Sequence, residues 1–528
     1  MNILIAEPMA AAGIELFRAQ PGWNVIVSSP KEYAAHLAEC DALVVRSAVQ
    51  VNNDVLSKAP KLRVVGRAGV GVDNVDLEAA TAAGVLVMNT PGGNAISVAE
   101  HTLALMLSMA RSIPQASAST KAGKWEKKKF LGNELRGKTL GIMGLGSIGR
   151  EVAKRARPFD MRIIASDPYV TSQIAKDLGI ELTSLDELYA QSDYVTLHVS
   201  LTPETERLLN AGAFAKMKPG VRIVNCARGE LIDVDALRDA MTSGKVAGAA
   251  LDVFPTEPTS ANDPLFAIES VVATPHIGGS TEEAQETVGV RIAEQMVEYL
   301  KSGVAINAVN MPALSPDQYR ALSPFLSVAE RLGTFAAYLA AANPKTVRII
   351  YAGRIAEGNT ALLRNAGIAG LLKRSASQTV NVVNAMQIAS DRGWAIVERH
   401  EPRAAYSDTI RIELETEDGT TTVEGAPLLG APRLLQVDGI YCEATLQGHF
   451  ICMKNDDVPG VIGHVGQVLG SNGINIANFS LGRRDCTPEP GKPQEAIAMV
   501  SIDGPVRDEV LKQLMENSAV KLARAITL

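Results

Sequence analysis

The sequence predicts an α/β protein in which helix-covered parallel sheets are followed by two smaller α+β units. Three observations predict this class. Short β-branched runs alternate with amphipathic stretches through residues 1–310, and a glycine-rich turn directly follows a strand at 144–149. Residues 449–528 are predicted as strand, helix, strand, strand, helix, strand, which is the ferredoxin-like order. A length of 528 residues corresponds to roughly three or four domains.

The first strand series lies before residue 97. Its runs are Ile3–Ala6, Val25–Val27, Ala42–Val45, Val64–Val65 and Val85–Met88. A turn signal and an amphipathic stretch follow each run, which is typical of a parallel sheet with helical crossovers. The stretch Ser97–Arg111 is apolar on most sides, so we expect a buried helix that links two lobes.

The second strand series suits a doubly wound dinucleotide fold. Its runs are Thr139–Met143, Arg162–Ala165, Tyr194–Leu197, Arg222–Asn225, Gly248–Asp252 and Val271–Ala273. Six strands in this order are typical of a Rossmann domain.

The last third of the chain begins after a Pro-containing segment, 311–316, which we interpret as a linker. A strand is predicted at Val347–Gly353, and helices are predicted near Thr360–Leu372 and Val380–Arg392. Two Asp-Gly pairs, at 418–419 and 438–439, predict hairpin turns.

Composition and charge exclude several classes of protein. The net charge of −7 gives no electrostatic footprint for nucleic acid or for an anionic membrane. The five cysteines form no CxxC pair and the seven histidines show no metal-ligand spacing, so we expect neither disulfides nor a metal site. The N-terminus is predicted to be a strand and no apolar run approaches 18 residues, so we expect a soluble, cytoplasmic protein.

The glycine-rich turn is a GxGxxG motif in the context that a dinucleotide requires. Gly144 allows the tight turn, Gly146 lets the backbone approach a pyrophosphate, and Gly149 lets the following helix pack on the strand. Asp167 follows the next strand, 18 residues after Gly149. A carboxylate there can bind the ribose hydroxyls and would repel a 2′-phosphate, which favours NAD over NADP. The alternatives are a glycine turn without a nucleotide and an Asp167 that merely caps a helix.

Three later strands each end in a polar residue that can carry chemistry. These are Arg228, Glu257 and His276. Because the carboxyl ends of parallel strands line the ligand crevice, we expect the three side chains to converge. The arginine can hold a carboxylate, the histidine can exchange a proton with a hydroxyl, and the glutamate can orient the imidazole and stabilise its cation. With a nicotinamide nearby, the reaction class is hydride transfer at a carbon that bears a hydroxyl.

These residues resemble those of the D-isomer-specific 2-hydroxyacid dehydrogenase family, and within it the long-form phosphoglycerate dehydrogenases. The resemblance covers nearly the whole chain and is strongest at 65–76, 144–150, 225–229, 249–254 and 274–281. It implies NAD-dependent oxidation of 3-phospho-D-glycerate to 3-phosphohydroxypyruvate, the first step of phosphorylated L-serine biosynthesis, with a side reduction of 2-oxoglutarate to 2-hydroxyglutarate.

The resemblance also assigns roles to residues. Arg228, Glu257 and His276 would be catalytic. The cofactor would be bound by Gly144, Gly146, Ser147, Ile148, Gly149, Asp167, Ser200, Cys226, Ala227, Arg228, Asp252, His276, Gly278 and Gly279. The substrate's anionic ends would be bound by Arg46, Ser47, Gly69 and Val70, and its phosphate by Lys127 and Lys129 of a basic run. The plainer interpretation of that run is a solvated face.

Four domains follow from the resemblance. A discontinuous, flavodoxin-like substrate lobe comprises 1–97 and 284–310, and an NAD-binding Rossmann domain comprises 98–283. Residues 311–448 would form an intervening, allosteric-substrate-binding domain and residues 449–528 a ferredoxin-like ACT domain. In the family the ACT pattern binds L-serine, and here Asp457 and Asn475 would take that effector. The family often has an aromatic residue or a histidine where this chain has Asn455. We further expect a homotetramer.

Other histidines and one cysteine have plainer interpretations. His101 lies at the start of a helix, and we interpret it as structural. His198 follows an apolar strand, and we interpret it either as structural or as a residue that supports the site from behind. No base is indicated beside Cys226, which we interpret as small packing next to the cofactor.

Two alternative functions stay open from the sequence. One is another D-2-hydroxyacid dehydrogenase, such as a hydroxypyruvate or glyoxylate reductase, although those enzymes usually lack the C-terminal third. The other is a non-enzymatic, NAD-sensing corepressor-like protein, against which the ACT pattern and the absence of a basic surface both count.

Overall fold

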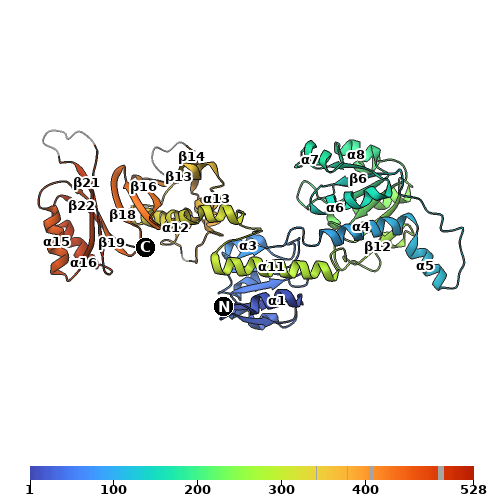
Figure 1. Cartoon of the computed structure of the whole chain (residues 1–528), viewed down its shortest axis with the longest axis horizontal. Helices are drawn as coiled ribbons and strands as arrows, with labels where there is room; N and C mark the ends of the chain where they lie inside the picture. The colour runs from blue at the N-terminus through green and yellow to red at the C-terminus, as the bar shows by residue number, and fades with distance from the viewer. Residues whose placement is uncertain (341, 377, 403–407, 486–492) are drawn as a thin grey trace.

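The computed structural model describes residues 1–528 except 341, 377, 403–407 and 486–492. The described residues form four sheets, with the first sheet lying between the second and the third (Figure 1). The α/β class predicted from the sequence is confirmed. No helix of the described part of the chain is long and apolar enough to cross a membrane.

The first sheet has five parallel strands in the order β2-β1-β3-β4-β5, which is the flavodoxin-like order. Its strands are β1 (Asn2–Ile5), β2 (Asn24–Val27), β3 (Ala42–Val45), β4 (Val64–Arg67) and β5 (Leu86–Met88). Its helices are α1 (Ala11–Arg18), α2 (Asn53–Ser57), α3 (Leu77–Ala82) and, returning from later in the chain, α11 (Glu282–Ser302). Val288, Ile292 and Met296 of α11 pack into the core of this sheet.

The second sheet has seven parallel strands in the order β12-β11-β10-β9-β6-β7-β8. Its strands are β6 (Thr139–Met143), β7 (Arg162–Ser166), β8 (Glu181–Leu182), β9 (Tyr194–Leu197), β10 (Val221–Asn225), β11 (Val246–Leu251) and β12 (Val271–Ala273). Six strands were expected, and the extra one is β8, which at two residues is too short to give a hydrophobic run. The strand order reverses between β6 and β9, which is where doubly wound sheets bind their ligands.

Helices cover both faces of the second sheet. They are α4 (Ala95–Ala110), α6 (Ser147–Ala156), α7 (Ser172–Asp177), α8 (Leu185–Gln191), α9 (Ala211–Lys216) and α10 (Val234–Thr242). The expected linking helix is α4, which is buried along most of its length. The helix α5 (Ile113–Lys121) projects away from the sheet (Figure 1).

The third sheet has six strands in the order β14-β13-β15-β16-β17-β18. They are β13 (Thr346–Ala352), β14 (Ala395–Glu401), β15 (Thr409–Thr416), β16 (Gly419–Leu428), β17 (Ala431–Val437) and β18 (Ile440–Thr445). Both Asp-Gly hairpins are confirmed, at β15–β16 and β17–β18. The helices are α12 (Pro316–Leu339), α13 (Ala361–Leu372) and α14 (Ala385–Asp391).

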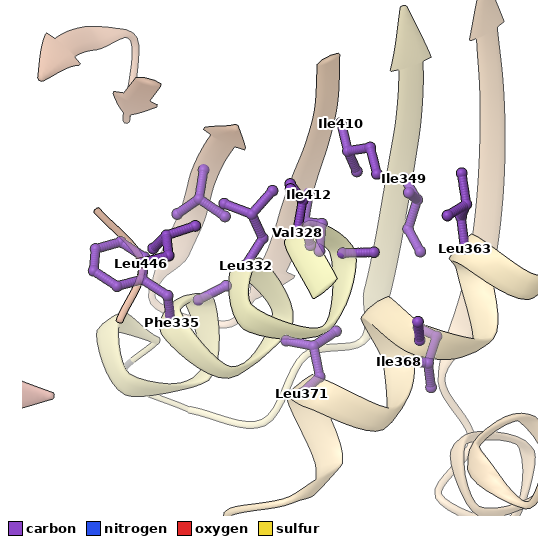
Figure 2. Close-up of a cluster of buried hydrophobic side chains, with 14 of the residues drawn as sticks. Val328, Leu332, Phe335, Ile349, Leu363, Ile368, Leu371, Ile410, Ile412 and Leu446 are labelled. Carbon is purple, nitrogen blue, oxygen red and sulfur yellow. The ribbon is translucent and has the colours of Figure 1, made fainter. Parts of the chain in front are cut away.

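The helix α12 was not predicted. It begins with a Ser315–Gln318 capping box and contains Pro324, whose presence argues locally against a helix. Tertiary packing decides in its favour: Val328, Leu332 and Phe335 of α12 face α13 and the sheet in the core of Figure 2.

The fourth sheet has the antiparallel order β20-β21-β19-β22, which is ferredoxin-like. Its strands are β19 (His449–Asp456), β20 (Ile476–Arg483), β21 (Glu495–Ile502) and β22 (Val520–Thr527), and its helices are α15 (Val461–Ser471) and α16 (Asp508–Met515). Phe450 of β19 meets Phe335 of α12, with ring centroids 6.1 Å apart, so the third and fourth sheets share one core.

Candidate active site

The glycine turn lies at the switch point of the second sheet and is built for close backbone approach. Gly144 has a φ of +93°, and a Cβ there would lie 2.7 Å from the carbonyl oxygen of His198. A Cβ on Gly149 would lie 2.0 Å from the carbonyl oxygen of Gly144. Gly146, by contrast, has open space where its Cβ would be, and it precedes the first turn of α6. The backbone N–H groups of that turn can therefore receive a pyrophosphate.

Asp167 joins the end of β7 to this turn. Its carboxylate accepts hydrogen bonds from the backbone N–H groups of Leu145 and Tyr169, both at 2.8 Å. A carboxylate has about four acceptor positions, so two remain for the hydroxyls of a ribose. These cradle residues fit a dinucleotide that lacks a 2′-phosphate.

Asp252 holds the turn that follows β12. The carboxylate is only 1 % exposed and accepts hydrogen bonds from the backbone of Ile277 at 2.9 Å and of Gly278 at 2.8 Å. The Thr274 hydroxyl donates to it at 2.6 Å. Burial raises the pKa of Asp252, but hydrogen bonds from His101, Thr274 and the backbone outweigh burial and hold the pKa below its ordinary value. Asp252 is therefore a fixed negative charge beneath the turn.

His276 and Glu257, which the sequence predicts to act as an acid–base pair, contact each other in the structure. The Nδ1 of His276 lies 2.6 Å from Oε2 of Glu257, and the other carboxylate oxygen accepts from the backbone N–H of Phe254 at 2.9 Å. Because Glu257 occupies Nδ1, the Nε2 of the imidazole is the nitrogen left to exchange a proton with a ligand.

Arg228 reaches from β10 across to the first lobe. Its guanidinium contacts the carboxylate of Asp73 through two hydrogen bonds, at 2.7 and 3.2 Å. Gly71 makes room, since a Cβ there would lie 1.9 Å from an Arg228 nitrogen. Burial raises the pKa of Asp73, but its contact with Arg228 outweighs burial and holds the pKa below its ordinary value. Arg228, which the sequence predicts to bind a substrate carboxylate, thus already binds a carboxylate of the protein.

Arg67, at the end of β4, is a cation that the sequence analysis missed. Its Nε is buried without a hydrogen-bond partner, and its guanidinium covers Gly69 so closely that a Cβ there could not fit. Burial and the nearby charge of Arg228 lower the pKa of Arg67, and Arg46 adds a further like charge. The signal was present in the sequence, because Arg67 also lies at the carboxyl end of a buried strand. Three guanidinium groups gathered in this way can attract a doubly anionic ligand.

Comparisons with known proteins agree with this geometry. The model of the D-isomer specific 2-hydroxyacid dehydrogenase NAD binding domain matches residues 103–278, and that of the D-3-phosphoglycerate dehydrogenase intervening domain matches residues 321–438. The D-3-phosphoglycerate dehydrogenase of Archaeoglobus fulgidus is 41% identical over 97% of both chains, and that of Bacillus subtilis is 39% identical, also over 97% of both. This chain belongs to the D-3-phosphoglycerate dehydrogenase family.

Solved structures place the catalytic half in the same fold. The TT0316 protein of Thermus thermophilus has a TM-score of 0.54 and 35% identity, and the match covers 58% of this chain and 100% of that one. An NAD-dependent formate dehydrogenase from Staphylococcus aureus, in complex with NAD, has a TM-score of 0.51 and 30% identity and covers 57% and 96% of the two chains. The dinucleotide cofactor of this dehydrogenase is NAD.

Several predicted residues lie where this dehydrogenase's cofactor site would extend. Ser147 and Ile148 begin α6, and the exposed Ser200 follows β9. Cys226 is buried beside Asp252, and burial raises the pKa of its thiol to about 12, which agrees with a packing role. Ala227, Gly278 and Gly279 flank Arg228 and His276 along the chain.

Other predicted residues are not brought to His276 within one chain of this dehydrogenase. Lys129 forms an ion pair with Glu269 at 2.9 Å. Glu269 lies just before β12, whereas His276 lies just after it, so the two residues are at opposite ends of the strand. The neighbouring Lys127 is exposed. Their role at the substrate phosphate stays a prediction. In the described residues, no group of three or more histidines, cysteines or carboxylates could hold a metal ion.

The two predicted effector residues lie in the segments on either side of α15, beside the fourth sheet of the enzyme, and contact different partners. Asp457, between β19 and α15, pairs with Arg483 at 2.6 Å. Asn475 donates a hydrogen bond to Asp503 at 2.9 Å.

Proposed function

We propose that this chain oxidises 3-phospho-D-glycerate to 3-phosphohydroxypyruvate with NAD, the first step of phosphorylated L-serine biosynthesis. One observation carries the proposal. The His276–Glu257 pair follows β12 and β11 at the same sheet edge as the glycine turn, while Arg228 reaches from that edge to the first lobe. The crevice thus combines a base, a cation for a carboxylate and a dinucleotide cradle. The full-length relatives named as D-3-phosphoglycerate dehydrogenases support the choice of substrate.

Different cationic side chains bind the two anionic ends of the substrate. Arg228 binds the substrate carboxylate. That carboxylate must either displace Asp73 from the guanidinium of Arg228 or share the guanidinium with it. Arg46 and Arg67 attract the phosphate from the first lobe. With both ends held, the 2-hydroxyl faces His276, and orientation of this kind removes much of the entropic barrier.

Proton transfer is the task of His276. Its Nε2 accepts the hydroxyl proton, and Glu257 at 2.6 Å stabilises the resulting imidazolium. When bound, NAD would supply the hydride acceptor for the carbon that bears this hydroxyl. The cradle of Gly144, Gly146, Gly149 and Asp167 holds the cofactor, and we assign the remaining predicted cofactor residues, Ser147, Ile148, Ser200, Cys226, Ala227, Asp252, Gly278 and Gly279, to the same site.

The four sheets suggest a division into domains. We assign 1–97 with 284–310 to substrate binding, 98–283 to NAD binding, 311–448 to an intervening domain and 449–528 to an ACT domain. We propose L-serine as an effector of the last domain, bound near Asp457 and Asn475. The Arg483 that pairs with Asp457 could take the serine carboxylate.

We further propose a homotetramer in the cytoplasm. The projecting segment around α5 exposes large apolar side chains, including Trp125 at 85% and Leu131 at 91%. Apolar groups so exposed favour burial against a second copy of the chain.

The test is an assay of NADH formation over a panel of D-2-hydroxy acids. The proposal predicts the highest kcat/KM with 3-phospho-D-glycerate and a large loss when the phosphate is removed. A higher kcat/KM with glycerate, glycolate or lactate would overturn it. Removal of the phosphate-binding charge by Arg67→Gln should raise KM for the phosphorylated substrate and leave KM for glycerate nearly unchanged.

A further inference from the structure

The turn that carries His276 adopts a backbone conformation that needs outside support. His276 has a φ of +55°, in the left-handed region that non-glycine residues seldom occupy. A residue in that region is held there by its surroundings, and such residues gather at functional sites. What anchors this turn therefore decides where the imidazole lies.

Asp252 supplies one set of anchors. Its two carboxylate oxygens receive the N–H groups of Ile277 and Gly278, and its backbone oxygen receives the N–H of His276 at 2.8 Å. The orientation of the turn thus depends on the orientation of one buried carboxylate.

The helix α4 supplies the second set. Ser97 donates its hydroxyl hydrogen to the carbonyl oxygen of Gly278 at 2.7 Å. One helical turn later, the Nε2 of His101 lies 3.2 Å from a carboxylate oxygen of Asp252 and 3.1 Å from the hydroxyl oxygen of Thr274. Residues four apart share a helix face, so both side chains reach the same turn from α4.

We propose that His101 and Ser97 are positioning residues for the hydride transfer assigned above, on which this inference rests. His101 fixes the carboxylate of Asp252, and Ser97 fixes the far side of the turn at Gly278. Together they hold His276 in contact with Glu257. His101 thus has a more specific role than the packing expected from the sequence.

The contacts indicate which property of His101 matters. Two oxygen atoms lie within hydrogen-bond distance of Nε2, so the nitrogen must carry a hydrogen to serve the carboxylate. The amide nitrogen of a glutamine can supply a donor at a similar reach, whereas phenylalanine keeps the volume and loses the donor. This difference separates positioning from packing.

Four variants test the proposal: His101→Phe, His101→Gln, Ser97→Ala and, as a control, Glu100→Gln. Glu100 lies on the same helix, is exposed and pairs with Arg155 on the surface. The first readout is hydrogen–deuterium exchange of the peptide spanning 274–281 in the enzyme without substrate, compared with the peptide spanning 95–110. The second readout is kcat and KM for 3-phospho-D-glycerate.

The expected pattern is specific to the turn. His101→Phe should speed exchange at 277–278 while exchange within α4 stays near that of the wild type. It should lower kcat by about 10- to 100-fold, the loss typical of a displaced reacting group, while KM changes less. Ser97→Ala should act in the same direction, His101→Gln should restore most of both properties, and Glu100→Gln should match the wild type.

Two results would overturn the proposal. One is unchanged exchange at the turn in both His101→Phe and Ser97→Ala. The other is a glutamine variant as impaired as the phenylalanine variant, with α4 itself exchanging faster, which would indicate packing. Because exchange needs no substrate, a wild-type enzyme inactive on 3-phospho-D-glycerate would refute the proposed function without deciding the role of His101.

Discussion

The substitution Glu257→Gln removes the charge beside His276 while keeping the length of the side chain. The two groups are separated by 2.6 Å, a distance at which opposite unit charges attract by about 1.6 kcal/mol in water and about 6 kcal/mol at an effective dielectric constant of 20. The side chains are 49% and 35% exposed, so the lower part of this range applies. A hydrogen bond to a charged group contributes about 1.5–3 kcal/mol.

The energy of this charged hydrogen bond, about 1.5–3 kcal/mol, sets the expected change in kcat. Stabilisation of the imidazolium is needed only after the proton has begun to move, so its loss should raise the barrier and leave binding largely intact. At about 1.4 kcal/mol per factor of ten, kcat should fall by about 10- to 150-fold. The Phe254 N–H can still bond to the amide oxygen, which keeps the glutamine in place.

The assay is NADH formation under saturating NAD, with 3-phospho-D-glycerate varied. Glu39→Gln is the matched control, because Glu39 forms an exposed ion pair with Lys61 at the amino ends of β3 and β4, away from the predicted site. A loss in kcat below about 5-fold, the upper limit for an ordinary exposed ion pair, would refute the role given to Glu257.

Four further predictions concern other parts of the molecule. His276→Ala should lower kcat by about 10²–10⁴-fold, while NAD affinity measured by calorimetry stays within a few-fold; near wild-type turnover would contradict its role. Asp167→Ala combined with Tyr169→Arg should raise the NADP-to-NAD ratio of kcat/KM by about 10-fold or more, since each 1.4 kcal/mol of relieved repulsion gives that factor, and equal use of both cofactors by the wild type would argue against the assignment. Because burial raises the pKa of Cys226 to about 12, mass spectrometry should find its thiol unmodified after treatment with iodoacetamide at about pH 8, whereas rapid alkylation would contradict its burial. L-Serine should bind the full chain in calorimetry and fail to bind Asp457→Ala; no heat with the wild type would end the effector hypothesis.

Local sequence patterns were sufficient to predict most of the strands, turns and candidate site residues of the catalytic half. Strand runs, the glycine turn and the polar residues at strand ends are short-range signals, because a parallel strand and its turn are specified by neighbouring residues. The rule that strand ends share one edge then predicted that Glu257 and His276 would meet, and the structure confirms that contact at 2.6 Å. The same rule, applied to the first sheet, would have found Arg67.

Only the tertiary structure decided which charges neutralise one another. Arg228 and Asp73 are 155 positions apart, and His101 and Asp252 are 151 apart. No local pattern encodes such pairs, because they depend on how two lobes and a linking helix dock. The same limit applies to Lys129, whose partner Glu269 lies at the far end of a strand, and to α12, whose proline was outweighed by a buried apolar face. Sequence specifies elements through short-range periodicity, whereas the partners of buried charges are chosen by packing between distant segments, since a charge leaves water only where the folded chain supplies a counter-charge or hydrogen bonds.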